Sequence, residues 1–121
     1  TFGGYPLASV VGIFAIKTLI EENLANKAKI RGKQLMDYFN EIKNDFPDKI
    51  KEVRGKGLLT AFEMFDSKHL DGHKVSVELL NNGIYAKETH HTTVRIAPAL
   101  TVSEKHIEQI ASGIRKVVAN L

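Results

Sequence analysis

Hydrophobic residues recur along this chain with two periods, one typical of helices and one typical of strands. From Pro6 to about Asn23 the chain is apolar on nearly every side, which predicts a long helix that is buried all round. From about Leu24 to Phe46 the apolar residues keep to one stripe, and Gly32 within that stripe indicates a close helix contact. A last striped helix is expected after a cap at Thr101 or Ser103.

The middle of the chain predicts two pairs of short strands with a short helix between them. The strands are expected at Ile50–Arg54, Leu58–Phe65, Ile84–Lys87 and around Arg95, and the helix at Val75–Leu80. The segment Gly55-Lys56-Gly57 is interpreted as the turn of the first pair, and residues 66–72 as a polar loop. The order α-α-β-β-α-β-β-α predicts an α+β domain in which a short antiparallel sheet carries helices on one face.

Length and composition indicate one ordinary globular domain, because the 121 residues are 43% hydrophobic and 26% charged, with a net charge of +3. The absence of cysteine excludes disulfides, thiolate metal sites and a cysteine nucleophile. No secretory signal is visible, and the longest apolar run, residues 7–20, is too short to span a bilayer. The basic run at residues 27–33 is better explained by a solvated helix face than by nucleic-acid binding.

Two features are candidate anion sites. The loop Thr1-Phe2-Gly3-Gly4 leads into a helix that starts at Pro6, and free backbone N–H groups at a helix start favour phosphate. Arg95 lies in mid-strand shortly before Pro98, where its planar fork suits a carboxylate or a phosphate. A surface arginine paired with a nearby acid is the simpler interpretation of that strand alone. Residues 54–57 fit either a phosphate nest or, more commonly, a turn between strands.

The other reactive side chains predict no site. His90 and His91 are adjacent and would point to opposite faces of an extended segment, while His69 and His73 are separated by a helix-breaking Asp-Gly pair, so no metal site is expected. No serine lies in a nucleophile elbow. Lys17 is expected to snorkel outward from its apolar helix and not to form a Schiff base.

Three segments together resemble the C-terminal part of class III pyridoxal-phosphate aminotransferases. They are Thr1–Ala8, Val53–Leu58, and Lys87-Glu88-Thr89-His90 followed by Arg95-Ile96-Ala97-Pro98. Within that family, residues 86–100 are most similar to ornithine aminotransferases. The resemblance implies the small C-terminal domain of a fold-type-I aminotransferase at residues 24–121. Residues 1–23 would then be a loop and helix that belong to, or lead from, the large cofactor domain. Tyr5 and Ala99 depart from the family pattern, which often has asparagine and proline there.

The resemblance also implies roles for individual residues. Thr1, with Gly3 and Gly4 in its loop, would bind the phosphate of pyridoxal 5'-phosphate in the neighbouring subunit of a homodimer, and Arg95 would bind a substrate carboxylate. The reaction would transfer the δ-amino group of ornithine to 2-oxoglutarate in the cytoplasm, or in the mitochondrial matrix of a eukaryote. The catalytic lysine of the family lies upstream, so the chain is expected to be an inactive fragment by itself.

Two alternatives stay open from the sequence. Another class III aminotransferase, acting on acetylornithine or a different ω-amine, would share most of these segments. A free-standing α+β domain that senses carboxylates or binds a partner would share the element order.

Overall fold

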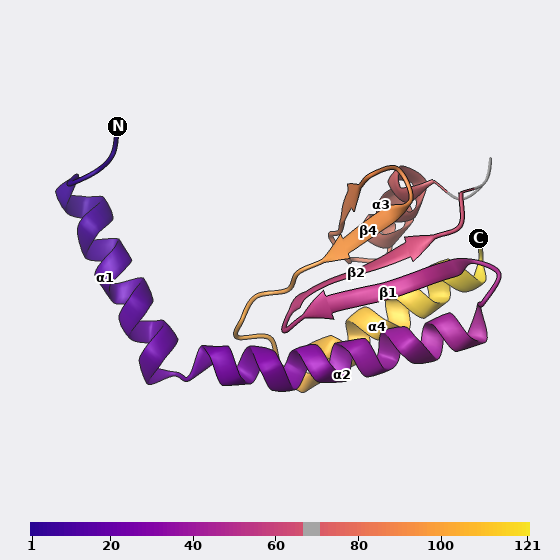
Figure 1. The fold of residues 1–121 in the computed structure, drawn as a ribbon, viewed down its shortest axis with the longest axis horizontal. Coiled ribbons are helices and arrows are strands. Elements are labelled where there is room, and N and C mark those ends of the chain that lie inside the picture. The colour runs from indigo at the N-terminus through magenta and orange to yellow at the C-terminus, as the bar shows by residue number, and fades with distance from the viewer. Residues whose placement is uncertain (67–70) are drawn as a thin grey trace.

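The computed structural model describes residues 1–66 and 71–121 of the chain. It has the predicted order of helices and strands (Figure 1). The helices are α1 (Pro6–Glu21), α2 (Leu24–Asp45), α3 (Gly72–Asn81) and α4 (Glu104–Ala119), and the strands are β1 (Ile50–Lys56), β2 (Leu59–Met64), β3 (Lys87–Thr89) and β4 (Thr93–Ile96). The predicted α+β class is therefore confirmed.

The four strands form one antiparallel sheet in the order β1-β2-β4-β3. Its two faces differ, as the alternation along β2 shows: Thr60, Phe62 and Met64 are buried, whereas Glu63 and Leu59 face outward. Helices α2, α3 and α4 all lie on the buried face (Figure 1), and the opposite face is left open.

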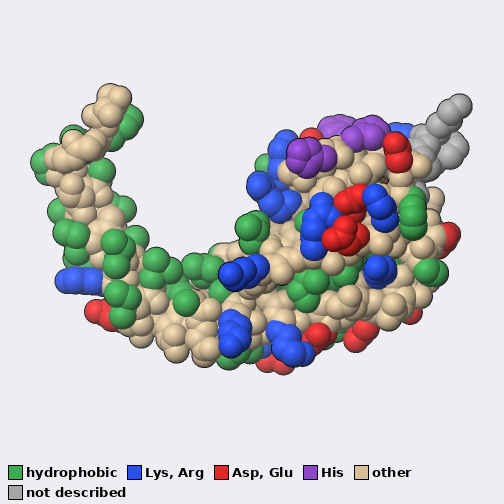
Figure 2. Space-filling model, viewed as in Figure 1, with side chains coloured by type: hydrophobic (Ala, Val, Ile, Leu, Met, Phe, Trp, Pro, Cys, Tyr) green, Lys and Arg blue, Asp and Glu red, His purple; other side chains and the backbone are tan. Residues whose placement is uncertain are grey.

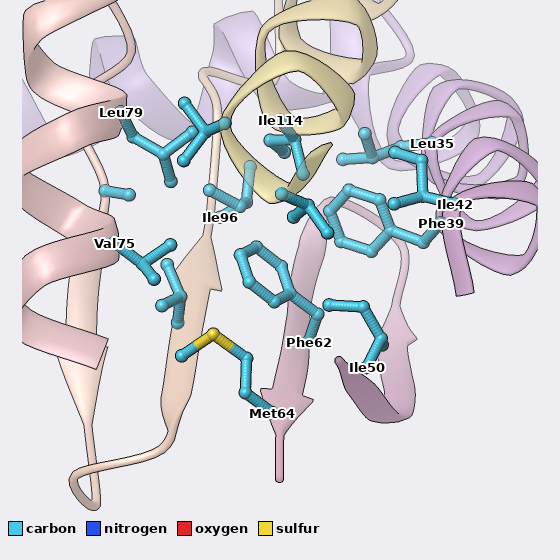
Figure 3. Packing of buried hydrophobic residues seen from close by; sticks show 14 of the residues in the cluster. Leu35, Phe39, Ile42, Ile50, Phe62, Met64, Val75, Leu79, Ile96 and Ile114 are labelled. Atoms are coloured by element: carbon cyan, nitrogen blue, oxygen red, sulfur yellow. The ribbon is translucent and has the colours of Figure 1, made fainter. Parts of the chain in front are cut away.

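The hydrophobic core lies between this buried face and the three helices (Figure 3). Phe39 of α2 meets Phe62 of β2 edge to face, with ring centroids 5.9 Å apart. Val75 and Leu79 of α3 and Ile114 of α4 complete the layer. Burying one such side chain stabilises the fold by about 1.5–3 kcal/mol. The sheet that positions the candidate site is therefore held rigidly from behind.

Helix α1 forms where it was predicted, but none of its residues is buried within this chain. Asn23 adopts a left-handed conformation, with φ 50°, between α1 and α2. From that point α1 projects away from the sheet (Figure 1). Its apolar side chains are exposed, as the face seen in Figure 2 shows, and Ile20 keeps 73% of its surface accessible. The all-round burial that the sequence predicted is not provided by residues of this chain, because α2 is the main element that α1 touches.

The hairpin turn begins two residues later than predicted. Gly55 and Lys56 pair with Thr60 and Leu59, so both belong to β1, and the turn consists of Gly57-Leu58. Gly57 has a φ of 57°, which a two-residue hairpin turn with glycine at its first position requires. The phosphate nest considered for residues 54–57 is therefore not formed, since Gly55 and Lys56 are paired in the sheet.

The third strand is also shifted, from Ile84–Lys87 to Lys87–Thr89. The cause is the end of α3, where the Ile84 N–H donates to the Leu79 carbonyl at 2.9 Å and the Ile84 side chain packs against the core. Those contacts keep residues 84–86 from pairing with β4. The helix caps match prediction more closely, since the Ser103 hydroxyl accepts a hydrogen bond from the His106 N–H at the start of α4.

Candidate functional site

Arg95 lies on the open face of the sheet in a row of residues that are in register across all four strands. The row runs from Arg54 on β1 through Ala61 on β2 and Arg95 on β4 to Lys87 on β3. Residues paired directly across neighbouring strands point to the same face. The register thus places three cationic side chains on one face and only the small Ala61 between the two arginines.

A shallow depression of about 410 Å³ lies over this row from Arg54 to Arg95. Its lining residues come from all four strands and the end of the first hairpin: Arg54, Gly55, Lys56, Leu59, Thr60, Ala61, Thr89, Thr93 and Arg95. Three of them are cations and none is an acid, so the depression suits an anion. Among the described residues, Arg95 donates no hydrogen bond and forms no ion pair, and its guanidinium is exposed.

The acids of the open face are engaged elsewhere. Glu63 accepts from Lys51 Nζ at 2.7 Å and from Arg54 Nη1 at 2.8 Å, and Arg54 also contacts Glu52 at 3.2 Å. The hydrogen bonds from Lys51 and Arg54 lower the pKa of Glu63, and the same carboxylate raises the pKa of Lys51. In Figure 2 acidic and basic side chains accordingly lie together over β1 and β2. Arg95 is left as the arginine without a described partner in the depression.

Thr1, Gly3 and Gly4 lie in the exposed loop before α1. The Tyr5 N–H donates to the Phe2 carbonyl at 3.1 Å, Gly4 has a φ of 78°, and no side chain caps the helix start. The backbone N–H groups there are consequently available to an anion. Figure 1 shows the N-terminus at the end of α1 that is far from the sheet. This chain therefore does not bring Thr1 and Arg95 together.

The two adjacent histidines differ from prediction. His90 and His91 are not extended but lie in the β3–β4 turn, both with positive φ (53° and 60°). The turn is fixed to the start of α3, because the Gly72 N–H donates to the His91 carbonyl at 2.7 Å. No group of three metal-ligating side chains occurs within residues 1–66 and 71–121. His69, the other half of the pair with His73, lies outside the described residues.

Sequence reasoning did not find the residues that surround Arg95. Arg54 and Glu63 are distant from Arg95 in sequence, and only the strand register makes them its neighbours. The outward alternation along β2 could have placed Glu63 on the open face, but no local pattern gives its partner on β1. In the part of the chain that the structure describes, no helix has the length and apolarity needed to cross a bilayer.

Comparison with known proteins identifies this architecture. Residues 1–118 match the family model for class III aminotransferases. The mitochondrial ornithine aminotransferase of Arabidopsis thaliana is 38% identical over 121 residues, which is 98% of this chain and 25% of the relative. Acetylornithine aminotransferase from Elizabethkingia anophelis superposes with a TM-score of 0.89 at 29% identity, over 96% of this chain and 29% of that one. Ornithine aminotransferase from Toxoplasma gondii was solved with partial occupancy of pyridoxal phosphate at its active site. It superposes with a TM-score of 0.87 at 33% identity, over 95% of this chain and 27% of that one.

The fold, four helices with a four-stranded antiparallel sheet, matches part of an aminotransferase. The chain belongs to the class III aminotransferase family. It spans about a quarter of the length of the curated relatives that it matches.

Proposed function

We propose that this chain is part of an ornithine aminotransferase, which transfers the δ-amino group of ornithine to 2-oxoglutarate with pyridoxal 5'-phosphate as cofactor. Arg95 binds a substrate carboxylate in this proposal. The observation that carries it is an exposed arginine, without a described partner, in a depression lined by further cations and no acid. The likeness to ornithine aminotransferases of Arabidopsis thaliana and Oryza sativa, at 38% and 32% identity, supports the choice of ornithine.

The start of α1 fits the phosphate of the cofactor. Thr1 offers a hydroxyl, Gly4 has the positive φ that lets backbone approach an anion, and the helix start has no side-chain cap. When bound, pyridoxal phosphate supplies the electron sink for amino transfer. Thr1, with Gly3 and Gly4, would hold and orient its phosphate. Arg95 would orient the substrate, whose carboxylate it would hold with two parallel hydrogen bonds.

Thr1 and Arg95 are proposed to serve different active sites of a homodimer. Their separation along α1 supports this arrangement, as do the exposed apolar sides of α1, which another surface could cover. We place the enzyme in the cytoplasm, or in the mitochondrial matrix of a eukaryote, since the relative from Arabidopsis is a mitochondrial enzyme.

The carboxylate assignment is tested by Arg95→Lys in the full-length enzyme. Lysine keeps the charge but loses the planar fork, so kcat/KM for 2-oxoglutarate should fall by about 5- to 150-fold, equivalent to about 1–3 kcal/mol. Arg115→Lys is the matched control, because Arg115 lies on α4 and pairs with Glu41 and Asp45, away from the depression. Unchanged kinetics of Arg95→Lys with every carboxylate substrate would refute the assignment.

The cofactor assignment is tested by Thr1→Val in mixed dimers. Each mixed dimer would combine one subunit that carries Thr1→Val and is inactivated at its own catalytic lysine with one wild-type subunit. If Thr1 acts across the dimer, loss of the hydroxyl should weaken cofactor retention in the neighbouring active site, measured by the cofactor released on dilution. A defect confined to the subunit that carries the substitution would contradict the proposal.

A second candidate substrate is acetylornithine. The observation in its favour is the structural match to an acetylornithine aminotransferase, whose TM-score of 0.89 compares with 0.87 for the Toxoplasma ornithine enzyme. Initial rates of the full-length protein with ornithine, acetylornithine and other ω-amines decide between them, because selectivity depends on contacts made within the site. A clear preference for acetylornithine would replace ornithine in the proposal and leave the role of Arg95 unchanged.

A further inference from the structure

The open face holds an acid within reach of Arg95 that does not bind it. Glu63 lies two residues along β2 from Ala61, the residue directly opposite Arg95, so it occupies a diagonal position on the same face. Diagonal neighbours across antiparallel strands are about 7–8 Å apart, which long side chains can bridge. The Glu63 side chain is only 18% exposed, so its carboxylate lies among the strands and not free in solvent.

Glu63 is held toward the other edge of the sheet by two cations of β1. Lys51 Nζ donates to Oε1 at 2.7 Å, and Arg54 Nη1 donates to Oε2 at 2.8 Å, so each carboxylate oxygen has a charged partner. Arg54 is itself fixed by Glu52 at 3.2 Å and lies within 3.5 Å of the Thr93 hydroxyl on β4. The Arg54 guanidinium therefore stands at the boundary between Glu63 and the depression that contains Arg95.

The charges of this group cancel only when Arg54 is present. Lys51 and Arg54 balance Glu52 and Glu63, so the group presents no net charge to Arg95. Without Arg54, two carboxylates would face a single lysine. Arg95, diagonal to Glu63 and without a described partner, could then attract this carboxylate, which would compete there with the carboxylate of a substrate.

We infer that Arg54 is a positioning residue, which together with Lys51 keeps Glu63 away from Arg95 and so leaves Arg95 free for a dicarboxylic substrate. The inference rests on the proposed function of Arg95 as a carboxylate anchor. Arg54 lines the depression as well, but the role inferred for it acts through Glu63. The role thus predicts that any defect from losing Arg54 disappears when Glu63 loses its charge.

The test compares Arg54→Ala, Glu63→Gln and the double variant in the full-length enzyme. Arg54→Ala should raise the KM for 2-oxoglutarate about fivefold with little change in kcat, as expected for competition by one exposed ion pair. The inhibition constant of glutarate, an unreactive dicarboxylate, should rise by the same factor. In the double variant Arg54→Ala/Glu63→Gln, the KM and the inhibition constant should return to within about twofold of wild type. Glu63→Gln alone should leave both constants within the same range.

Arg115→Ala is the matched control, because this arginine also bridges two acids, Glu41 and Asp45, but on the helical side of the molecule. It should leave both constants unchanged. A purely structural role for Arg54 would lower the melting temperature and would not be rescued by Glu63→Gln. Unaltered constants in Arg54→Ala, or failure of the rescue, overturn the inference. If Arg95→Lys is impaired but Arg54→Ala is not, the inference about Arg54 fails and the proposed role of Arg95 stands. If neither variant is impaired, both the inference and the proposed function fail.

Discussion

Single charged residues on the open face of the sheet differ in how their charge is used. Glu63 has a lowered pKa because Lys51 and Arg54 donate hydrogen bonds to its carboxylate. Arg95, one row away, donates to no described residue. Glu63 is thus paired within the sheet, whereas Arg95 is the residue that we propose as the carboxylate anchor.

The lowered pKa of Glu63 makes a prediction about stability and pH. A carboxyl group whose folded pKa lies below its unfolded value of about 4.3 stabilises the fold above that pH, and the contribution is lost as the pH falls through the folded pKa. The free energy of unfolding should therefore fall between about pH 5 and pH 3, and less steeply in Glu63→Gln, as measured by urea denaturation of this chain.

Glu21→Gln, at the exposed end of α1, is the charge-matched control for that experiment and should keep the wild-type dependence. Parallel curves for wild type and Glu63→Gln across the whole acidic range would show that the Lys51–Glu63–Arg54 group does not contribute to the pH dependence.

At the scale of the elements, helix α2 packs closely against the first hairpin, where Gly32 lies against the backbone of Gly57. A Cβ on Gly32 would lie 2.1 Å from the Gly57 carbonyl oxygen, well inside contact distance. Gly32→Ala should consequently destabilise the chain by about 1–3 kcal/mol through overpacking, although alanine is the better helix former by about 1 kcal/mol. The midpoint of urea denaturation measures the effect.

Gly12→Ala is the matched helical control, since nothing lies within 4 Å of a Cβ built at that position in α1. It should not lower the midpoint. If Gly32→Ala were as stable as Gly12→Ala, then the close packing of α2 on the hairpin would not be a constraint on the sequence.

The types and order of the elements were predictable because the period of hydrophobic residues is a local property of the sequence. The glycine at position 32 predicted a close helix contact, and the structure shows a close approach of α2 to the backbone of Gly57 in the hairpin turn. Strand ends were less predictable. The ends of β1 and β3 depend on partners elsewhere, such as Thr60 for Gly55 and the α3 end for Ile84, and no local pattern shows them.

The candidate site was predictable only in part for the same reason. Arg95 stood out because an arginine in mid-strand near Pro98 is a local feature. Its row with Arg54 and Ala61, and the diagonal position of Glu63, follow from the register of separate strands. The turn at His90 and His91 was missed because neither glycine nor asparagine marks its two left-handed positions.

At the scale of the whole molecule, the described chain divides into a packed layer and a projecting helix. All buried core residues lie at position 24 or later, in the sheet and the helices that cover it. Helix α1 adds exposed apolar side chains, including Leu7, Val11 and Phe14, and no buried residue. We propose on this basis that residues 24–121 form the folding unit and that α1 belongs with a surface outside it.

Removal of residues 1–22 tests that division. Asn23 is kept, because its carbonyl accepts hydrogen bonds from the N–H groups of Asn26 and Lys27 at the start of α2. The shortened chain should unfold in one cooperative transition, with a melting temperature within a few degrees of the 121-residue chain, since no core contact is lost. Self-association, followed by sedimentation, should decrease with the loss of the apolar surface. A variant that retains α1 but carries Val11→Gln and Phe14→Gln distinguishes loss of the apolar surface from shortening of the chain. It should self-associate less than the 121-residue chain while keeping its helix content. Loss of cooperative unfolding in the shortened chain would instead make α1 part of the folding unit.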